Sequence, residues 1–314
     1  MKIYQGFRDK RLKKRPRAVA IGIFDGVHRG HRKIIQKALG AARRSRAASL
    51  VVTFEPHPNK ILRPGQKHPI LMSLEHRLRL FERLGIAEVL VIRFDRRFSK
   101  ITHEDFLRGL LLKRLGMKSL CVGHDFRFGF RGRGDARYLR QESGKRGFGF
   151  SLVAPLKVRG RTISSTRIRR LIERGHLRKA EEMLGRPVSV YGTVIHGRGR
   201  GRSVGFPTAN LNPHHETLPP RGVYAARGFL GERELAGVIH IGKRPTFADR
   251  QASLEVHFLN FHKNIYGREV ELIFIKKLRP IRKFRDKAAL AEAIREDIRK
   301  AAISLYKAPF TDYN

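Results

Sequence analysis

The chain has 314 residues, with 68 Lys and Arg against 27 Asp and Glu, and a formal net charge of +41. At ~100–200 residues per domain, this length predicts two domains. Hydrophobic residues make up 41% of the chain, which excludes a wholly disordered protein despite the charge. The single cysteine excludes a disulfide framework and a cysteine-cluster metal site, and it suits a reducing cytoplasm.

The amino terminus carries a basic segment followed by the apolar run 18–24, a pattern that a signal peptide would also give. The run is short, and Asp25 follows it where a small-residue cleavage site should lie. No stretch approaches the ~18 apolar residues that span a bilayer. We therefore interpret the run as a buried strand and expect a cytoplasmic protein with no membrane partner.

Residues 1–184 alternate short apolar runs with helical patterns. The expected strands are 18–24, 50–54, 88–92 and 119–123, and the expected helices are 30–48, 73–84, 103–115, 165–174 and 176–184. Continuous apolar runs separated by helices predict an α/β domain with a parallel sheet. Gly185, followed by Arg186 and Pro187, is a helix stop signal and places the domain boundary there.

Residues 185–314 have a different composition: short runs rich in Val, Ile, Phe and Tyr are separated by Gly and Pro. The expected strands are 189–195, 222–229, 235–241, 254–261 and 269–278, followed by a helix over about 286–306. This pattern predicts an antiparallel barrel or sandwich closed by a C-terminal helix.

The positive charge is uneven, because residues 1–184 carry 45 basic and 15 acidic side chains and residues 185–314 carry 23 and 12. Clustered Lys and Arg favour nucleic acid, but a basic proteome or an anionic nucleotide substrate also explains the charge and is the reading we prefer. We see no nucleic-acid module and expect only weak, salt-dependent binding. Arg77, Arg79 and Arg83 are expected on a solvent-exposed helix face.

A first chemical site follows the strand at 18–24, where the sequence reads FDGVHRGHRKII. His28 and His31 are three residues apart and open a helix, so they share a face. Gly30 leaves room for a ligand near the backbone, and the helix start favours an anion. Two ordinary surface histidines are the alternative reading, and a zinc site lacks a third ligand at sensible spacing.

Three further segments accompany this one in order, TFEPHP at 53–58, VGHDFRFG at 122–129 and ISSTRIR at 163–169. Together they resemble the adenylyltransferase half of the prokaryotic bifunctional riboflavin kinase/FAD synthetase family. The resemblance implies a Rossmann-like nucleotidyltransferase domain at 1–184. It also implies that residues 22–31 bind ATP and its phosphates, through Gly22, Phe24, Asp25, His28, Gly30 and His31.

The other segments have a structural and a functional reading each. His57 is the candidate for contact with the flavin phosphate, although the PHP segment also suits a rigid loop. Asp125 either holds polar groups of the nucleotide or caps a turn. Ser165 and Thr166 begin a helix as caps and can grip phosphate, with Arg169 adding charge, while Arg167 and Arg170 are expected to be solvated.

A second chemical site lies within YGTVIHGRGRGRSVGFPTAN at 191–210, a glycine-rich loop whose N–H groups can wrap phosphates. An RGG-like RNA segment is the competing reading. The string GR-x-x-GFPTAN resembles the flavokinase motif and implies a riboflavin kinase domain at 185–314. In that reading Gly197, Gly205 and Pro207 belong to the phosphate loop, and Thr208 and Asn210 hold Mg²⁺ bound to ATP.

Glu255 within LEVH matches the family's base for the riboflavin 5′-hydroxyl. Two residues depart from the family pattern: His240 stands where an Asn is usual, and Asn260 replaces an Asp. The resemblance as a whole implies a bifunctional enzyme that uses riboflavin, FMN and ATP and makes FMN and FAD. Two alternatives stay open, the same fold with one activity and a basic nucleic-acid-binding protein with vestigial motifs. We expect a monomer or a loose oligomer.

Overall fold

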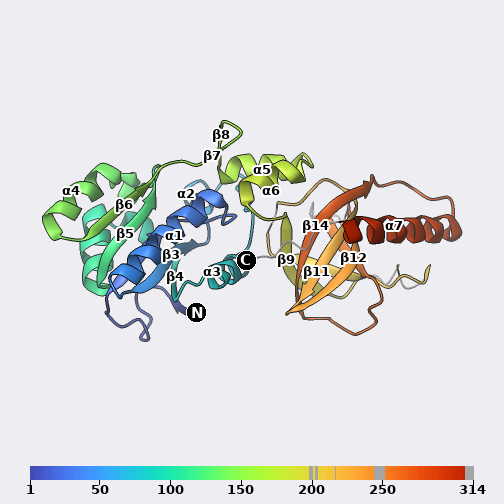
Figure 1. The fold of residues 1–314 in the computed structure, drawn as a ribbon, viewed down its shortest axis with the longest axis horizontal. Helices are drawn as coiled ribbons and strands as arrows, with labels where there is room; N and C mark the ends of the chain where they lie inside the picture. Colours follow the sequence, from blue (N-terminus) through green and yellow to red (C-terminus); the bar gives the residue numbers. More distant parts are fainter. Residues whose placement is uncertain (198–200, 202–203, 216, 244–251, 308–314) are drawn as a thin grey trace. The chain divides into compact units, whose positions relative to one another are not determined.

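The structure is a computed structural model that describes residues 1–197, 201, 204–215, 217–243 and 252–307. It divides into two compact units, one formed by residues 1–70 and 74–165 and the other by the chain from residue 166 onward with residues 71–73. Figure 1 shows the elements of each unit. No helix among these residues combines the length and hydropathy needed to cross a bilayer.

The N-terminal unit is built on a six-stranded parallel sheet, which confirms the expected α/β class. Its strand order is β1-β4-β3-β2-β5-β6. The strands are β1 (Lys2–Gln5), β2 (Arg17–Ile21), β3 (Ala48–Glu55), β4 (Glu88–Arg93), β5 (Met117–Gly123) and β6 (Gly149–Val153). The direction of strand addition reverses at β2, where β3 lies on one side and β5 on the other, and open α/β sheets bind ligands at such a point.

The helices of this unit run between its strands. They are α1 (Arg29–Arg44), α2 (Pro58–Leu62), α3 (Leu74–Arg83) and α4 (Ala136–Arg146), with a π-helix, η2, at Asp105–Arg114. Short 3₁₀ turns at Phe98–Lys100 and Phe130–Gly132 and a small hairpin, β7 (Lys157–Val158) with β8 (Arg161–Thr162), complete the unit. The helix expected over 103–115 is therefore present but π-helical, with Leu115 N donating to Leu110 O at 3.0 Å.

A buried ion pair joins two strands of this sheet near their amino-terminal ends. Arg17 Nε donates to Glu88 Oε2 at 2.7 Å, and Tyr4 Oη donates to Glu88 Oε1 at 2.6 Å. Burial raises the pKa of Glu88, but the hydrogen bonds from Arg17 and Tyr4 outweigh burial and leave that pKa lowered. Arg17 and Glu88 are both fully buried, so each compensates the other's charge.

Substitution of Arg17 by Met is expected to lower the free energy of unfolding by ~3–5 kcal/mol, because Glu88 is then left buried without its main partner. Urea denaturation followed by circular dichroism measures the loss. The double variant Arg17→Met/Glu88→Gln removes the stranded charge and should recover part of it. A single variant as stable as the parent would contradict this role.

The second unit is a closed six-stranded barrel, in the order β10-β13-β12-β11-β14-β9. Its strands are β9 (Ser189–Ile195), β10 (Ala209–Pro213), β11 (Gly222–Leu230), β12 (Arg233–Lys243), β13 (Ala252–Phe258) and β14 (Glu269–Arg279). The expected antiparallel barrel is confirmed. Helix α7 (Lys287–Lys307) packs on β11, β12 and β14, and α5 (Ser165–Glu173) and α6 (Leu177–Leu184) precede the barrel.

Candidate active sites

The turn after β2 has an unusual backbone. Phe24, Gly26 and Val27 have φ angles of 53°, 92° and 38°, so three residues in four adopt the left-handed region. Phe24 and Asp25 are buried there, and Phe24 packs edge-on against Phe81 of α3. Such conformations cost free energy and are found where the surrounding structure holds them for a function.

His28 and His31 lie together at the start of α1, as their spacing predicts. His28 is the N-cap residue, and its Nδ1 accepts a hydrogen bond from the main-chain N–H of His31 at 3.2 Å. The two rings stack with centroids 3.5 Å apart and planes 20° apart. Because Nδ1 accepts, the proton of a neutral His28 ring is on Nε2, which makes that nitrogen a hydrogen-bond donor.

Gly30 leaves room for the His28 ring. A Cβ on residue 30 would lie 3.2 Å from Cε1 of the His28 ring. Gly22, at the other end of the turn, would likewise bring a Cβ to 3.0 Å from the Phe24 ring. These two glycines therefore let the aromatic side chains fold back over the turn.

Helix α5 begins beside the same turn. Ser165 Oγ donates to the carbonyl oxygen of Asp25 at 2.8 Å, although the two residues are 140 positions apart. Thr166 follows in the helix, and its Oγ1 accepts from Arg169 Nη2 at 3.1 Å. The structure therefore places Ser165 beside the turn after β2, where the sequence predicted a nucleotide site.

His57 and Asp125 follow the two strands that flank β2. His57 caps the short helix α2, with its Nδ1 accepting from Asn59 N at 3.1 Å. Asp125 comes directly after β5, and its side chain is 83% exposed. Both lie at the carboxyl edge of the sheet, on opposite sides of the histidine turn.

Arg77 corrects a prediction, because it is buried rather than on a solvent face. It reaches the ends of two strands: its Nη1 donates to the carbonyl oxygen of Ile23 at 2.8 Å and to Thr53 Oγ1 at 3.0 Å, and its Nη2 pairs with Glu55. Burial lowers the pKa of the guanidinium, and the carboxylate of Glu55 opposes that change. Arg77 thus holds the turn after β2 in place against the end of β3, where the TFEPHP segment begins.

Replacing Arg77 with Leu is expected to reduce FAD formation by ~10²-fold, because small displacements of reacting groups have effects of that size. FMN formation from riboflavin should be unchanged. Chromatography of products measures both, and Arg83→Leu, at an exposed position of the same helix, is the matched control. Equal losses in the two variants would refute the positioning role.

The barrel presents a row of polar side chains across three neighbouring strands. Asn210 of β10 pairs in register with Glu255 of β13, and Glu255 pairs with His240 of β12. Leu254 and Val256, on either side of Glu255, are buried, whereas Glu255 is half-buried. Since side chains alternate along a strand, the row lies on the face opposite to these core residues.

Thr208 and Pro207 bring the phosphate-loop motif to the same row. Thr208 Oγ1 lies 3.5 Å from Glu255 Oε2, and the carbonyl oxygen of Pro207 lies 2.8 Å from His257 Nδ1. Gly205 has a φ of 85°. The expected loop is shorter than 191–210, since β9 and β10 take up both of its ends. Residues 198–200 and 202 of GRGRGR, and Ser203 after it, lie outside the described residues.

Gly197 closely approaches the Asn210 side chain. A Cβ at residue 197 would lie 1.8 Å from Asn210 Nδ2, so Gly197→Ala must displace that amide. We expect FMN formation to fall by ~10²-fold and FAD formation from supplied FMN to persist. Gly144→Ala, where the added Cβ meets open space, is the control. Unchanged riboflavin phosphorylation in Gly197→Ala would show that the Asn210 side chain is not part of the site.

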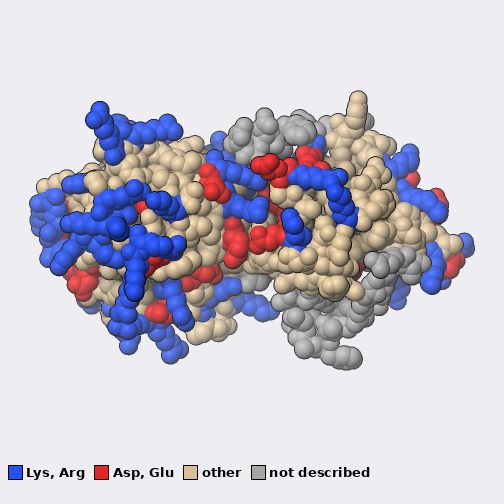
Figure 2. Space-filling view, turned by 90° about the horizontal axis from the view of Figure 1, so that it is seen from below, with Lys and Arg blue, Asp and Glu red and all other residues tan. Residues whose placement is uncertain are grey.

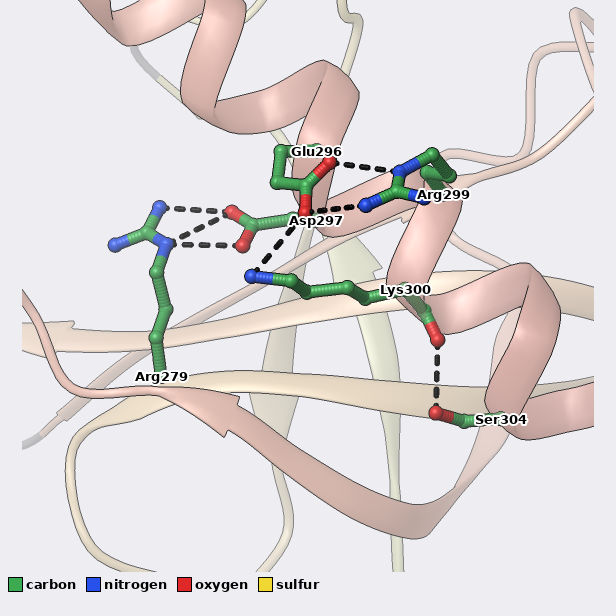
Figure 3. Close-up of polar contacts among 6 residues, drawn as sticks. All are labelled: Arg279, Glu296, Asp297, Arg299, Lys300 and Ser304. Carbon is green, nitrogen blue, oxygen red and sulfur yellow. Dashed lines mark hydrogen bonds and ion pairs between the residues drawn. The ribbon is translucent and has the colours of Figure 1, made fainter.

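Helix α7 is fixed at one end of the polar row. Arg279, at the end of β14, makes a bidentate pair with Asp297 of α7, with its Nη2 at 2.8 Å from Oδ2 (Figure 3). Burial lowers the pKa of His240, with Glu255 opposing and Arg279 adding to the change. A neutral His240 next to Glu255 is therefore favoured. Asn260, the other departure from the family pattern, has a φ of 53°, which Asn and Asp both tolerate.

The residues present at the barrel site suit Mg²⁺. A hydroxyl, an amide oxygen and a carboxylate gather there from Thr208, Asn210 and Glu255, and Mg²⁺ prefers such hard oxygen ligands. Among the described residues no group of three or more His, Cys, Asp or Glu side chains is placed so that it could hold a metal ion.

Comparisons with known proteins match both halves of the chain. The FAD synthetase family matches residues 10–167, and the riboflavin kinase family matches residues 184–305. A bifunctional riboflavin kinase/FMN adenylyltransferase from Escherichia coli K12 is 38% identical over 89% of this chain and 90% of its own length. One from Listeria monocytogenes is 36% identical over 90% of each chain.

A solved structure shares the fold of nearly the whole chain. The macrolide-efflux protein from Streptococcus pneumoniae matches with a TM-score of 0.82 and 28% identity, over 96% of this chain and 99% of that one. Two enzyme families match in order along this one polypeptide, and the relatives align with it over nearly their full length. This chain therefore belongs to the bifunctional riboflavin kinase/FMN adenylyltransferase family.

Proposed function

We propose that this chain phosphorylates riboflavin with ATP to give FMN in residues 185–314, and transfers AMP from ATP to FMN in residues 1–184. The second reaction gives FAD and releases pyrophosphate. The proposal rests on one observation, which is that the chain has two separate candidate sites. One is the stacked histidines at the start of α1, and the other is the Thr208–Glu255 contact on the barrel.

At the adenylyltransferase site, a phosphate oxygen of FMN attacks the α-phosphorus of ATP and pyrophosphate leaves. His28 Nε2–H and the His31 ring donate to the phosphate oxygens, whose negative charge shifts as the bonds change. The helix start adds favourable N–H dipoles. Ser165, Thr166 and Arg169 are assigned to the phosphates, Asp125 to polar groups of the nucleotide and His57 to the flavin phosphate.

At the kinase site, Glu255 takes the proton of the riboflavin 5′-hydroxyl as that oxygen attacks the γ-phosphorus, and ADP leaves. Thr208 and Asn210 would hold Mg²⁺, which neutralises phosphate charge when bound. Gly197, Gly205 and Pro207 shape the phosphate loop. Neither reaction needs a covalent enzyme intermediate, because positioning and fixed donors supply the acceleration.

The proposal is tested by supplying purified protein with riboflavin and Mg-ATP and separating the products by chromatography. Accumulation of both FMN and FAD is expected. FMN alone would instead support a chain with a silent adenylyltransferase, and neither product would overturn the proposal. The proposal places the enzyme in the cytoplasm, as a monomer or a loose oligomer, with Cys121 reduced; Cys121 is free and buried.

A further inference from the structure

A groove of about 1180 Å³ lies in the N-terminal unit between the end of β1, the end of β4 and the π-helix η2. None of the residues assigned above to ATP, Mg²⁺ or flavin lines it. Its volume is somewhat larger than that of a typical small-molecule site, which is ~300–1,000 Å³. The groove therefore is large enough to be a binding site that neither proposed reaction uses.

The charge of the groove is strongly positive. Six of its fourteen lining residues are basic, compared with 68 basic residues in 314 for the whole chain, and one is acidic. The basic residues are Arg8, Lys14, Arg93, Arg97, Lys113 and Arg114. Figure 2 shows Lys and Arg gathered over much of one face of the N-terminal unit.

These cations are not neutralised by neighbouring carboxylates. Within the described residues none of the six forms an ion pair; Arg114 Nε donates instead to the carbonyl oxygen of Phe7 at 3.0 Å. Asp95, the one acidic residue of the groove, accepts from the main-chain N–H of Phe98 at 2.7 Å. Like charges gathered in a concave surface raise the local concentration of anions.

The floor of the groove is apolar. It is formed by Phe7, Ile92, Phe98, Ile101 and Leu110. Four of them are only partly buried where they pack on the main core, so apolar surface remains for a ligand to cover. Leu110 and Gly109 come from the π-helix, and π-helical turns are rare and frequently occur at functional sites.

We propose that this groove binds a small organic anion with a planar apolar body, separately from both active sites. The apolar floor would cover the body and the surrounding cations would bind the anionic group. A single strand of nucleic acid also pairs cations with aromatic rings, but it needs a row of exposed rings. Here Phe98 is packed with Phe54, Phe94 and Phe106, which favours the small ligand.

Isothermal titration calorimetry with 1-naphthyl phosphate tests the proposal on the full chain. Saturable one-to-one binding is expected. Inorganic phosphate has the anionic group without the apolar body, and 1-naphthalenemethanol has the apolar body without the anionic group, so both should bind much more weakly. Binding must persist when FMN and a non-hydrolysable ATP analogue saturate the active sites. Loss of binding under that condition would place the ligand in a substrate site and overturn the proposal.

Two neighbouring arginines provide a matched pair of variants. Arg96 and Arg97 are both exposed, but only Arg97 lines the groove. Arg97→Glu is expected to weaken binding of naphthyl phosphate roughly tenfold through charge reversal at short range. Arg96→Glu should change it little. Equal effects, or a groove that binds a ten-residue oligothymidylate but no naphthyl phosphate, would contradict the small-anion site.

Discussion

His28→Ala is expected to abolish FAD formation while riboflavin is still converted to FMN. The substitution removes the Nε2–H donor at the start of α1, and loss of one preorganised donor typically lowers kcat by ~10²–10³-fold. It also frees the His31 ring, which stacks on His28 with centroids 3.5 Å apart. Chromatography of the products of riboflavin and Mg-ATP gives both rates in one experiment.

A second variant separates the chemical role of His28 from its structural one. His28 caps α1, and loss of an N-cap costs ~1 kcal/mol of stability by itself. Asn is an equally good cap, so His28→Asn should keep the parent's melting temperature and still lose FAD formation. Recovery of activity with Asn would show that capping, and not the imidazole, is what the reaction needs. Loss of FMN as well would refute separate sites.

Glu255→Ala is expected to stop FMN formation from riboflavin, with supplied FMN still converted to FAD. Loss of a general base typically costs ~10²–10⁴-fold in rate. Glu255 has Thr208 at 3.5 Å and Asn210 and His240 as register partners, so its carboxylate also organises the row. Radiolabelled ATP with riboflavin measures the transfer of the γ-phosphoryl group.

Glu255→Gln tests whether Glu255 acts as a base or only organises the row of polar side chains. The amide keeps the size and the acceptor oxygen but cannot take a proton. If Glu255 is the base, Gln should be nearly as inactive as Ala. If the side chain only orders Thr208 and Asn210, Gln should restore much of the rate, and the base would then have to be found elsewhere.

The candidate site segments were predicted from their resemblance to a family, and spacing alone placed His28 and His31 together at the start of one helix. The alternating pattern of 253–258 is typical of a strand with Glu255 turned away from the core, but only the resemblance distinguishes Glu255 as a base. The order of apolar runs was likewise enough for the parallel sheet and the barrel.

The elements that were missed depend on contacts distant in sequence. The edge strands β1 and β6 are short, and β10 lies within a glycine-rich motif, so each is defined by its partner strand. Arg77 was misplaced because a basic residue on a helix usually faces solvent. Its spacing to Leu80 and Phe81, both buried, was the available signal that it lies on the packed face.

The Arg17–Glu88 pair and the histidine turn lie at opposite rims of one sheet, because β2 begins at Arg17 and ends just before the turn. Engineering at the amino rim should change the temperature at which activity is lost and leave the Michaelis constants for ATP and FMN as they are.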